Sequence, residues 1–237
     1  MPSNSSAPTA RGLSPLSIVI PVLNEAARLP ALLASLQPLR ARGVEVVVAD
    51  GGSHDGSDTL ARPLVDTLVA APRGRARQMN AGAAAARGAQ LLFLHADTTL
   101  PPQADTLVAA ALHGSARWGR FDVRIDGRSA WLPVVGAFMN RRSRWTGIAT
   151  GDQAMFLDRS LFEQLGGFPD QPLMEDVELC RRLRQQGLRP ACLRTPVHTS
   201  GRRWDERGAL RTIGLMWALR WRYWRGESAQ SLWEAYR

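Results

Sequence analysis

Short apolar runs alternate with helical segments along the first 100 residues of the chain. Four runs rich in β-branched residues predict strands: residues 16–22 (LSIVIPV), 44–50 (VEVVVAD), 66–71 (DTLVAA) and 89–97 (AQLLFLHAD). The segments between them predict helices over residues 28–43, 58–65 and 75–88. Strands that alternate with helices in this way form a parallel sheet through right-handed crossovers. The pattern therefore predicts an α/β fold with a Rossmann-like, mostly parallel central sheet flanked by helices.

Beyond Pro101 the pattern is less regular. It predicts a strand over residues 116–125, a strand and a helix within 151–168, and helices over 102–114, 131–145 and 174–187. Two further helices are expected near residues 210–225 and 228–236. No internal repeat or linker divides the sequence. We therefore expect a disordered tail over residues 1–14, one α/β domain over 15–200, and C-terminal helices over 201–237.

Polar side chains follow three of the four predicted strands, at the point where each strand ends. Asn24 and Glu25 follow the first strand, Asp50 ends the second, and His95 and Asp97 end the fourth. The carboxyl ends of parallel strands meet at one edge of a sheet, and ligands of open α/β folds bind there. The sequence therefore predicts a ligand site that these side chains share.

The chain has 237 residues and a formal net charge of +9, and all 30 of its basic residues are arginine. A basic surface is typical of proteins that bind nucleic acid. The chain is also rich in alanine and glycine, and GC-rich codons produce the same composition, so we expect no nucleic-acid partner. Arg73 and Arg75 are accordingly interpreted as part of a solvated arginine face. The 45% apolar content excludes global disorder.

The cysteines and the apolar runs bear on the location of the protein. Cys180 and Cys192 match no zinc-binding spacing, and two isolated thiols suit a reducing cytoplasm. The first residues lack the apolar region of a signal peptide, and no apolar stretch approaches the ~18 residues of a transmembrane helix. We expect a cytoplasmic protein, either soluble or peripheral at the inner face of the cell membrane.

The glycine-rich segment DGGSHDGS follows the second predicted strand but contains neither GxGxxG nor a P-loop. Gly51 and Gly52 allow a tight turn at a place where a side chain would obstruct a flat ligand. Asp50 can accept hydrogen bonds from the polar hydrogens of a base. Asp55 and Ser57 are interpreted as capping residues of the next helix.

Five motifs occur together along the chain. IPVLNE, VVVADGGSHDGS, RQMNAG, LLFLHADT and PLMEDVELCRRL have the order and approximate spacing of family 2 glycosyltransferases. More narrowly, the chain resembles the bacterial branch described as arsenosugar-biosynthesis or selenodomain-associated transferase 2. The resemblance covers about residues 14 to 200. It implies the GT-A fold, in which a Rossmann-like nucleotide-binding half merges with an acceptor half. It also implies transfer of a sugar from a nucleotide diphosphate with inversion, assisted by Mg²⁺ or Mn²⁺.

The resemblance assigns residues that bind the nucleotide sugar. Glu25 and Asp50 would hold the nucleoside, with Gly51 in the turn beside the base. Arg77 and Asn80 would approach the base or the diphosphate. Arginine suits a diphosphate because its planar fork donates two parallel hydrogen bonds to phosphate oxygens.

The motif HAD lies where the family usually has Asp-x-Asp. His95 replaces the first acid and can still donate a hydrogen bond to a ribose hydroxyl, while Asp97 keeps the position of the metal contact. Mg²⁺ often takes one or two carboxylates and completes its shell with phosphate oxygens and water. His198, in TPVHTSG, lies where many GT-A enzymes have a metal-binding histidine. The alternative is a structural histidine, because imidazole is not the ligand that Mg²⁺ prefers.

Glu175 and Asp176 lie at the start of the predicted helix MEDVELCRRLRQQG, and their presence there has two interpretations. Acidic side chains are favoured there by the positive end of the helix dipole. The resemblance instead makes Asp176 the general base, a role that contributes roughly 10²–10⁴-fold in rate. Glu175, together with Asp152 and Gln153 of the segment TGDQAMF, would belong to the acceptor side or to a loop that covers the diphosphate.

The C-terminal segment carries an aromatic stripe, in which large apolar side chains recur every three or four residues. Its members are Leu210, Ile213, Trp217, Trp221 and Trp224. Such a stripe is typical of a helix that packs on a core. Because several arginines accompany the tryptophans, the alternative is a helix that lies in the headgroup region of an anionic membrane. That alternative would suit a lipid-like acceptor.

The leading hypothesis is an inverting, metal-assisted glycosyltransferase that moves a sugar from a UDP-sugar, with GDP-sugars as the alternative, to a hydroxyl acceptor. A sugar-phosphate nucleotidyltransferase can share this sheet, but it needs a glycine-rich basic loop after the first strand, where this chain has PVLNE. A non-catalytic protein that binds a nucleotide sugar is the other alternative. The missing first acid of the Asp-x-Asp motif is its main support.

Overall fold

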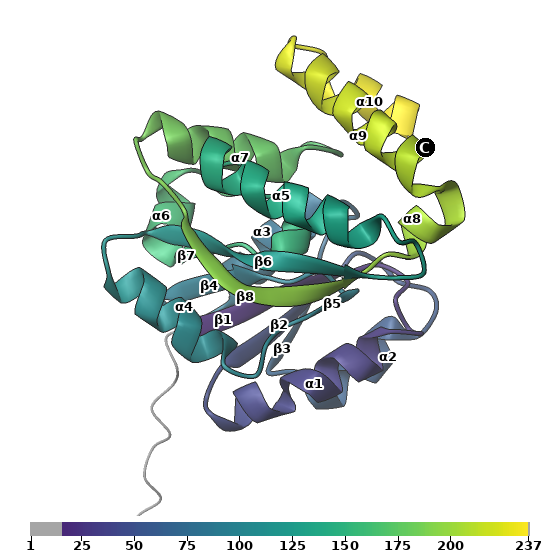
Figure 1. Ribbon diagram of the computed structural model, residues 1–237. Helices are drawn as coiled ribbons and strands as arrows, with labels where there is room; N and C mark the ends of the chain where they lie inside the picture. The colour runs from purple at the N-terminus through teal and green to yellow at the C-terminus, as the bar shows by residue number, and fades with distance from the viewer. Residues whose placement is uncertain (1–15, 237) are drawn as a thin grey trace, which may run out of the picture.

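The computed structural model describes residues 16–236, without the side chains of Arg203, Arg207, Ala209 and Leu210. The predicted tail over residues 1–14 lies outside this range. An eight-stranded sheet forms the centre of the described part, with the strand order β3-β2-β1-β4-β7-β6-β8-β5 (Figure 1). The strands are β1 (Leu16–Val22), β2 (Glu45–Asp50), β3 (Thr67–Ala70), β4 (Gln90–Phe93), β5 (Thr98–Thr99), β6 (Trp118–Asp126), β7 (Phe156–Asp158) and β8 (Ala191–Ser200).

The sheet has a parallel half and a mixed half. Strands β3, β2, β1 and β4 pair in parallel, as the sequence predicts. Strand β7 then joins β4 to β6 with antiparallel pairing on both sides. Strands β6 and β8 are parallel, and β5 pairs antiparallel with β8 at the edge. Because the first four strands are parallel, their carboxyl ends lie at one edge of the sheet.

Helices cover both faces of the sheet (Figure 1). They are α1 (Leu29–Ala41), α2 (Ser57–Ala61), α3 (Arg75–Ala85), α4 (Ala104–His113), α5 (Leu132–Thr146), α6 (Arg159–Gln164), α7 (Glu175–Gln185), α8 (Arg202–Arg207), α9 (Ala209–Trp224) and α10 (Ala229–Tyr236). Two short 3₁₀ turns, η1 (Arg62–Leu64) and η2 (Gly151–Gln153), complete the described elements. The sequence predicts each of these α-helices except α8.

The sheet is packed on both faces, as the continuous apolar strands of its parallel half require. On one face Ile18 and Ile20 pack with the leucines of α1 and with side chains of β6 and α5. On the other face Val19 packs with α3, α6 and α7. Successive side chains of a strand point to opposite faces, so β1 contributes to both cores. This double packing fixes the strand ends that carry the polar residues.

The end of β4 and the strand β8 differ from the sequence prediction. Strand β4 ends at Phe93, so residues 95–97 form a turn in which the Thr98 N–H donates to the His95 carbonyl oxygen (3.1 Å). Strand β8 is not predicted, because Pro196 interrupts its pattern. Its pairing with β6 shifts register between Phe121 and Asp122, directly beside this proline. Proline within a strand is tolerated at such irregularities, since it cannot donate a ladder hydrogen bond.

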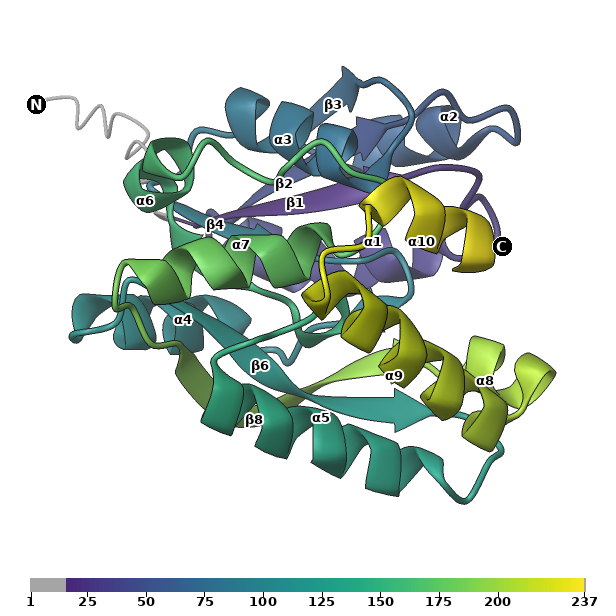
Figure 2. The same cartoon turned by 90° about the horizontal axis from the view of Figure 1, so that it is seen from above.

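The C-terminal helices pack beside the start of α7 (Figure 2). Leu219 of α9 and Leu232 of α10 are fully buried and form a small core with Leu173 and Met174, which precede α7. The C-terminal segment therefore contributes to the surroundings of the Glu175–Asp176 pair.

The structure gives the aromatic stripe a different position from the predicted core. Trp217, Trp221 and Trp224 are 59%, 56% and 83% exposed, whereas Leu219 faces the interior. The interpretation of these tryptophans as core residues is therefore wrong, and the Leu210 side chain lies outside the described atoms. Within residues 16–236, no helix combines the length and the apolar character that a bilayer crossing requires.

Candidate active site

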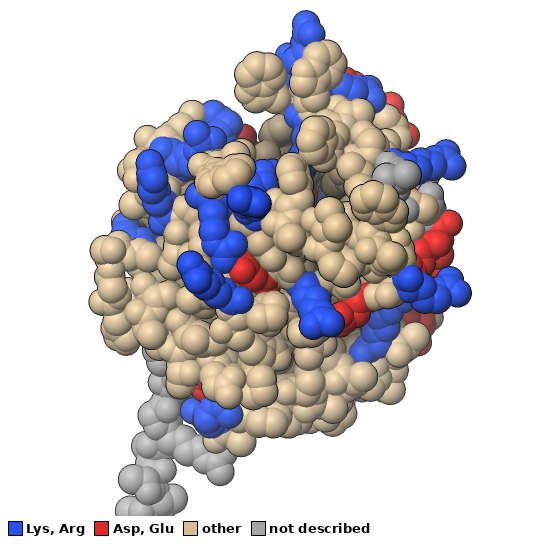
Figure 3. Space-filling view, viewed as in Figure 1, with Lys and Arg blue, Asp and Glu red and all other residues tan. Residues whose placement is uncertain are grey.

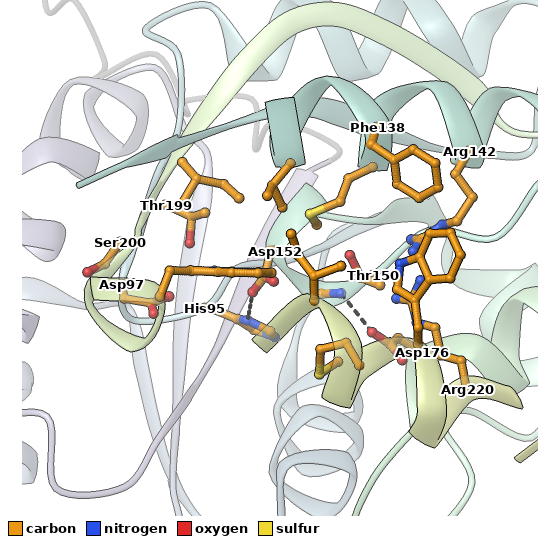
Figure 4. A pocket seen from close by; sticks show the side chains of 18 of the residues that line it. His95, Asp97, Phe138, Arg142, Thr150, Asp152, Asp176, Thr199, Ser200 and Arg220 are labelled. Carbon is orange, nitrogen blue, oxygen red and sulfur yellow. Dashed lines mark hydrogen bonds and ion pairs between the residues drawn. The ribbon is translucent and has the colours of Figure 1, made fainter. Parts of the chain in front are cut away.

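A cavity of about 420 Å³ lies between the edge of the sheet and the helices α5, α7 and α9. Asp97 and Asp176 both line it. In Figure 4, Asp97 lies at one end of the cavity near Ser200, whereas Asp176 lies at the other end with Arg142 and Arg220. The volume falls within the roughly 300–1,000 Å³ that is typical of small-molecule sites. Two carboxylates distant in sequence therefore share one ligand-sized space.

The Asp97 end is built from the turn after β4 and from the end of β8. The Ser200 N–H donates to the Asp97 carbonyl oxygen (3.1 Å), which holds these two segments together. The Thr98 hydroxyl lies 3.0 Å from the Thr199 hydroxyl and 3.3 Å from the exposed Asp97 carboxylate.

These groups test whether the chain fits a divalent cation. One exposed carboxylate beside hydroxyl oxygens fits a Mg²⁺ or Mn²⁺ ion that completes its shell with phosphate oxygens and water. The described residues contain no group of three or more His, Cys, Asp or Glu side chains placed to hold a metal. The donor set at Asp97 therefore fits a cation that arrives with a phosphate ligand and does not fit a site made of protein ligands alone.

His95 lies between the two ends of the cavity (Figure 4). Its Nδ1 is 3.3 Å from Oδ1 of Asp152. Its ring packs against the turn at Gly151, where an added Cβ would collide with the imidazole. The Nε2 atom is buried and has no hydrogen-bond partner among the described residues. One hydrogen-bonding atom of the ring is therefore left unused by the described residues.

Asp176 is fixed at the start of α7 by two backbone hydrogen bonds. The Gly151 N–H donates to its Oδ2 (2.9 Å) and the Val177 N–H donates to its Oδ1 (2.7 Å). Met174, just before the helix, has a left-handed backbone with φ of 64°. Such a conformation persists only where the surroundings impose it, and it is concentrated at functional sites. Each Asp176 oxygen keeps a further lone pair with which it can accept a proton or a ligand hydrogen bond.

Arg75 and Glu175 form an ion pair in the cavity. Nη1 of Arg75 lies 3.4 Å from Oε1 of Glu175, a residue that is only 2% exposed. Burial raises the pKa of Glu175 and the adjacent Asp176 raises it further, while Arg75 opposes both effects. Partial burial lowers the pKa of Arg75, whose side chain is 44% exposed, but the surrounding carboxylates, Glu175 first and Asp97 among them, raise it above its ordinary value. Arg75 therefore stands within a group of acids that extends from Glu175 toward Asp97.

The structure reverses the expected placement of Arg75 and Arg77. Arg75, expected on a solvated face, lines the cavity and keeps 44% of its side chain exposed and open to a ligand. Arg77, expected at the diphosphate, donates to Asp170 on the surface (2.7 Å) and does not line the cavity. Two residues along a helix are separated by about 200° of rotation, so both cannot face the same ligand.

The predicted nucleoside-binding acids lie at the ends of β1 and β2. Burial raises the pKa of Glu25, and the charge of Asp97 contributes in the same direction, so the two carboxylates lie near one another. Asp50 accepts hydrogen bonds from the N–H groups of Gly52 and Ser53 (both 3.0 Å) and from the Ser53 hydroxyl (2.5 Å). The Asp50 carboxylate thus stabilises the turn over residues 50–53. Neither Glu25 nor Asp50 lines the cavity.

Three other predicted site residues have structural roles in the fold. A Cβ on Gly51 would lie 2.8 Å from Cδ of the buried Gln78, so this glycine leaves room for the Gln78 side chain, a reason for glycine that the sequence does not show. Asn80 donates to the Phe168 carbonyl oxygen (2.8 Å) and accepts from the Phe168 N–H (2.9 Å). Gln153 is fully buried and donates to two side chains of α5. The side chains of Asn80 and Gln153 do not line the cavity.

His198 also lies away from the predicted metal site. Its Nδ1 is 2.9 Å from Oδ2 of Asp126, and the next residue on β8, Thr199, lines the cavity instead. Neighbouring side chains of a strand point to opposite faces, so Thr199 and His198 cannot both face Asp97. The expectation that His198 joins Asp97 as a ligand is therefore corrected by the pairing of β8 with β6 and β5.

Arg142 of α5 and Arg220 of α9 line the Asp176 end of the cavity, and the sequence motifs do not identify either as a site residue. Asn140 positions α5: its side chain accepts from the Val123 N–H (2.8 Å) and donates to the Val123 carbonyl oxygen (3.0 Å). In a chain whose basic residues are all arginine, residue type alone does not distinguish a cavity arginine from a surface one.

Comparison with known proteins identifies relatives of the chain. Residues 17–166 match the family model described as glycosyl transferase family 2. The chain is 32% identical over 156 residues to an undecaprenyl-phosphate 4-deoxy-4-formamido-L-arabinose transferase of Aeromonas hydrophila, covering 60% of this chain and 47% of the relative. It is 40% identical over 102 residues to a PGL/p-HBAD biosynthesis glycosyltransferase of Mycobacterium bovis, covering 40% of each protein. The chain thus spans less than half the length of these curated relatives.

Solved structures share the architecture. Residues 1–349 of S. aureus TarS superpose with a TM-score of 0.64 at 17% identity, covering 78% of this chain and 60% of that fragment. The mannosyltransferase PcManGT from Pyrobaculum calidifontis, in complex with GDP-Man and Mn²⁺, gives 0.62 at 24% identity, covering 83% and 59%. At these identities the likeness establishes the fold: a curled mixed sheet flanked by helices, as in GT-A glycosyltransferases. With the family model matching more than half of its residues, the chain belongs to glycosyl transferase family 2.

Proposed function

We propose that this protein transfers a sugar, with inversion, from a nucleotide-diphosphate sugar to an acceptor hydroxyl. The observation that carries the proposal is that Asp97 and Asp176 line opposite ends of one cavity large enough for a sugar. Asp97 is exposed and suited to a cation that also binds phosphate oxygens. Asp176 is fixed at the start of α7 by backbone hydrogen bonds. This separation matches a donor end and an acceptor end of a single transfer site.

Asp176 acts as the general base at the acceptor end. Its carboxylate takes the proton of the acceptor hydroxyl as the acceptor oxygen forms a bond to the anomeric carbon. The bond between that carbon and the phosphate oxygen breaks on the opposite face, and the nucleoside diphosphate leaves with the electron pair. The backbone hydrogen bonds from Gly151 and Val177 hold the base in position without occupying all its lone pairs.

Arg75 and Asp97 serve the donor end. Arg75 lines the cavity beside Glu175 and can donate paired hydrogen bonds to the diphosphate. Asp97 would hold a Mg²⁺ or Mn²⁺ ion, which when bound supplies Lewis-acid stabilisation of the diphosphate. The Nε2 of His95 offers a hydrogen bond to the donor between these two groups.

We propose a UDP-hexose as the donor and place the chain in the arsenosugar or selenodomain-associated branch that its motifs resemble. Glu25, Asp50 and the turn at Gly51 would face the nucleoside at the ends of β1 and β2. Among proteins of similar fold, glucosyl-3-phosphoglycerate synthase of Mycobacterium tuberculosis was crystallised with UDP and Mn²⁺ (TM-score 0.57, 20% identity, 78% of this chain and 70% of that one). PcManGT was crystallised with GDP-Man, so GDP-sugars are the second choice.

The C-terminal helices are proposed to contact an anionic membrane surface at the inner face of the cell membrane. Trp217, Trp221 and Trp224 are exposed along α9, and the Arg225 guanidinium lies 4.8 Å from the Trp221 ring centre. Basic side chains are more extensive than acidic ones on the face in Figure 3. Tryptophan and arginine together suit the headgroup region of anionic lipids. The protein should co-sediment with anionic vesicles. Equal co-sedimentation with neutral vesicles would contradict the proposed attraction between the arginines and anionic lipid.

Turnover of sugar nucleotides tests the central proposal. The purified protein is incubated with a panel of UDP- and GDP-sugars, with and without Mn²⁺ or Mg²⁺, and release of the nucleoside diphosphate is measured. We expect metal-dependent release for one donor, which Asp97→Ala abolishes or greatly reduces. Donor binding without release, in the presence of varied acceptors and unchanged in Asp176→Asn, would instead support the non-catalytic alternative that His95 in place of the first acid suggests.

A further inference from the structure

Two arginines at the acceptor end of the cavity carry buried nitrogens that no described residue pairs with. Nε and Nη2 of Arg142 and Nε of Arg220 are buried, and each lacks a hydrogen-bond partner in the part of the chain that the structure describes. They come from different helices, α5 and α9, and both lie beside Asp176 in Figure 4. By contrast, Arg40 on α1 donates two hydrogen bonds to Asp66 (2.8 and 3.0 Å). The two cavity arginines thus differ from arginines that have a structural ion pair.

Buried and unpaired guanidinium groups are unfavourable in a folded protein. Arginine keeps its charge at neutral pH, so burial cannot be relieved by loss of a proton. Burial lowers the pKa of Arg142, and the nearby Asp176 offsets part of this effect. A buried donor without a partner loses its hydration without a compensating hydrogen bond. An anionic ligand would supply the missing acceptors for both side chains.

Apolar side chains form the wall next to these arginines. Phe138 of α5 stacks on Trp217 of α9, with ring centres 5.5 Å apart. Val134, Phe138 and Trp217 line the cavity and are also 58%, 46% and 59% exposed, so the apolar wall continues from the cavity to the surface. An apolar path that leads to two arginines, whose buried nitrogens have no hydrogen-bond partner among the described residues, is complementary to a molecule with an apolar body and a charged head.

We propose that the acceptor is an anionic amphiphile, whose carboxylate or phosphate binds between Arg142 and Arg220 while its apolar chain lies along the wall formed by Phe138 and Trp217. This inference rests on the proposed transfer to a hydroxyl, because the same molecule must present a hydroxyl to Asp176. The anion does not react. It places the hydroxyl beside the base and supplies acceptors for the buried arginine nitrogens.

Four small probes separate the features of such an acceptor. Octanoyl-glycerol 3-phosphate carries a chain, a phosphate and a hydroxyl; monooctanoylglycerol lacks the anion; glycerol 3-phosphate lacks the chain; and 2-hydroxydecanoate carries a carboxylate. Binding is measured by quenching of tryptophan fluorescence, since Trp217 lines the cavity. We expect the phosphate amphiphile, the carboxylate amphiphile or both to bind at least about tenfold more tightly than the neutral amphiphile and the chainless phosphate.

Charge-removing variants of the two arginines provide the second measurement. Arg142→Met and Arg220→Met should each weaken binding of the anionic amphiphile by roughly tenfold or more, without changing binding of the neutral amphiphile. Arg141→Met and Arg211→Met are matched controls, because these exposed arginines lie on the same two helices and do not line the cavity. The Tm of Arg142→Met should not fall, since no hydrogen bond of its side chain is lost.

The outcomes distinguish this inference from the proposed function. If the anionic amphiphiles bind selectively but no probe receives a sugar, the result supports the proposed amphiphile site and contradicts the proposed sugar transfer. Sugar transfer with equal binding of neutral and anionic amphiphiles, or with no effect of either arginine variant, overturns the inference alone. Weaker binding of the nucleoside diphosphate in Arg142→Met and Arg220→Met also overturns it, because the arginines would then serve the donor.

Discussion

The loops at the ends of β1 and β2 differ from the walls of the cavity in how their polar groups are used. In the loops, Asn24 bridges to the next turn: its N–H donates to the Ser53 hydroxyl (2.9 Å) and its side chain accepts from the His54 N–H (2.9 Å). Asp55 accepts hydrogen bonds from Ala26 (2.9 Å) and Ser57 (2.6 Å) in the same way. These side chains form a closed network that ties the two loops together.

In the cavity, several polar groups have few partners or none. Asp97 has an exposed carboxylate, His95 has a buried Nε2 without a partner, and Arg142 has two such nitrogens among the described residues. Buried polar groups in proteins are normally satisfied, so unsatisfied ones require an explanation such as a ligand. The loops therefore provide shape and rigidity, and the cavity provides unused hydrogen-bonding capacity and charge. We therefore expect ligand binding and catalysis in the cavity, where the unused hydrogen-bonding groups and charges are concentrated.

The substitution Asp176→Asn should have the largest effect, because it removes the base from the cavity and leaves the loops untouched. We expect kcat to fall roughly 10²–10⁴-fold with little change in KM for the donor. Asparagine keeps one oxygen that can accept the Gly151 N–H but loses the acceptor for the Val177 N–H, so we expect a modest fall in the Tm and a protein that still folds. The measurement is the rate of nucleoside diphosphate release, and a kcat within about tenfold of the wild type assigns the base elsewhere.

The pair Arg75→Met and Arg77→Met compares a cavity arginine with a surface arginine on the same helix. Loss of Arg75 should raise KM for the donor roughly 10- to 100-fold, the equivalent of about 1.4–2.7 kcal/mol. Loss of Arg77 removes a surface contact with Asp170 and should leave the kinetics unchanged. Steady-state kinetics of both variants checks this, and a larger effect for Arg77 would restore its predicted role at the diphosphate.

The substitution Gly51→Ala tests whether the loop glycine serves the fold. Its Cβ would approach the buried Gln78, which donates to the Val22 carbonyl oxygen (2.5 Å) and cannot move freely. Overpacking of this kind costs about 1–3 kcal/mol in the free energy of unfolding. Urea unfolding of Gly51→Ala, Gln78→Ala and the double variant should show that Gln78→Ala relieves part of the loss. Full stability combined with lost donor binding would show that the glycine is reserved for a ligand.

Glu175→Gln should give the smallest effect, visible as a change in pH dependence. Burial raises the folded-state pKa of Glu175 above its ordinary value of 4.5, so the folded protein binds this proton more tightly than the unfolded chain does. The resulting stabilisation is complete below about pH 4.5 and is lost as the pH rises through the folded pKa. The wild type should therefore lose stability relative to Glu175→Gln across this window. Parallel unfolding curves at all pH values would contradict the raised pKa.

Much of the fold could be predicted from the sequence because it depends on local patterns. The apolar runs at residues 16–22 and 44–50 are buried strands, and the stops at Gly43 and Gly187, with φ of 95° and 73°, end α1 and α7 as expected. Strand β8 could not be predicted in this way. Its stability comes from pairing with β6 along eight positions, and its own pattern is broken by Pro196.

The candidate site was predictable only in part. The motifs single out Asp97, Asp176 and His95, and all three residues line one cavity. They do not show that the amides of Asn80 and Gln153 are used inside the fold, or that His198 turns toward Asp126. Residue type and order leave these choices open, because each polar group can bind either a ligand or the protein's own backbone.

The sequence by itself determined most of the elements, the parallel direction of the first four strands and the family. Periods of two and of 3.6 residues in apolar side chains are properties of the chain alone, and they follow from local backbone geometry. The tertiary structure decided which of Arg75 and Arg77 faces the cavity, and it brought Arg142 and Arg220 from separate helices to Asp176. These outcomes depend on helix rotation and on packing between distant segments, which fix side-chain direction only once the whole core is assembled.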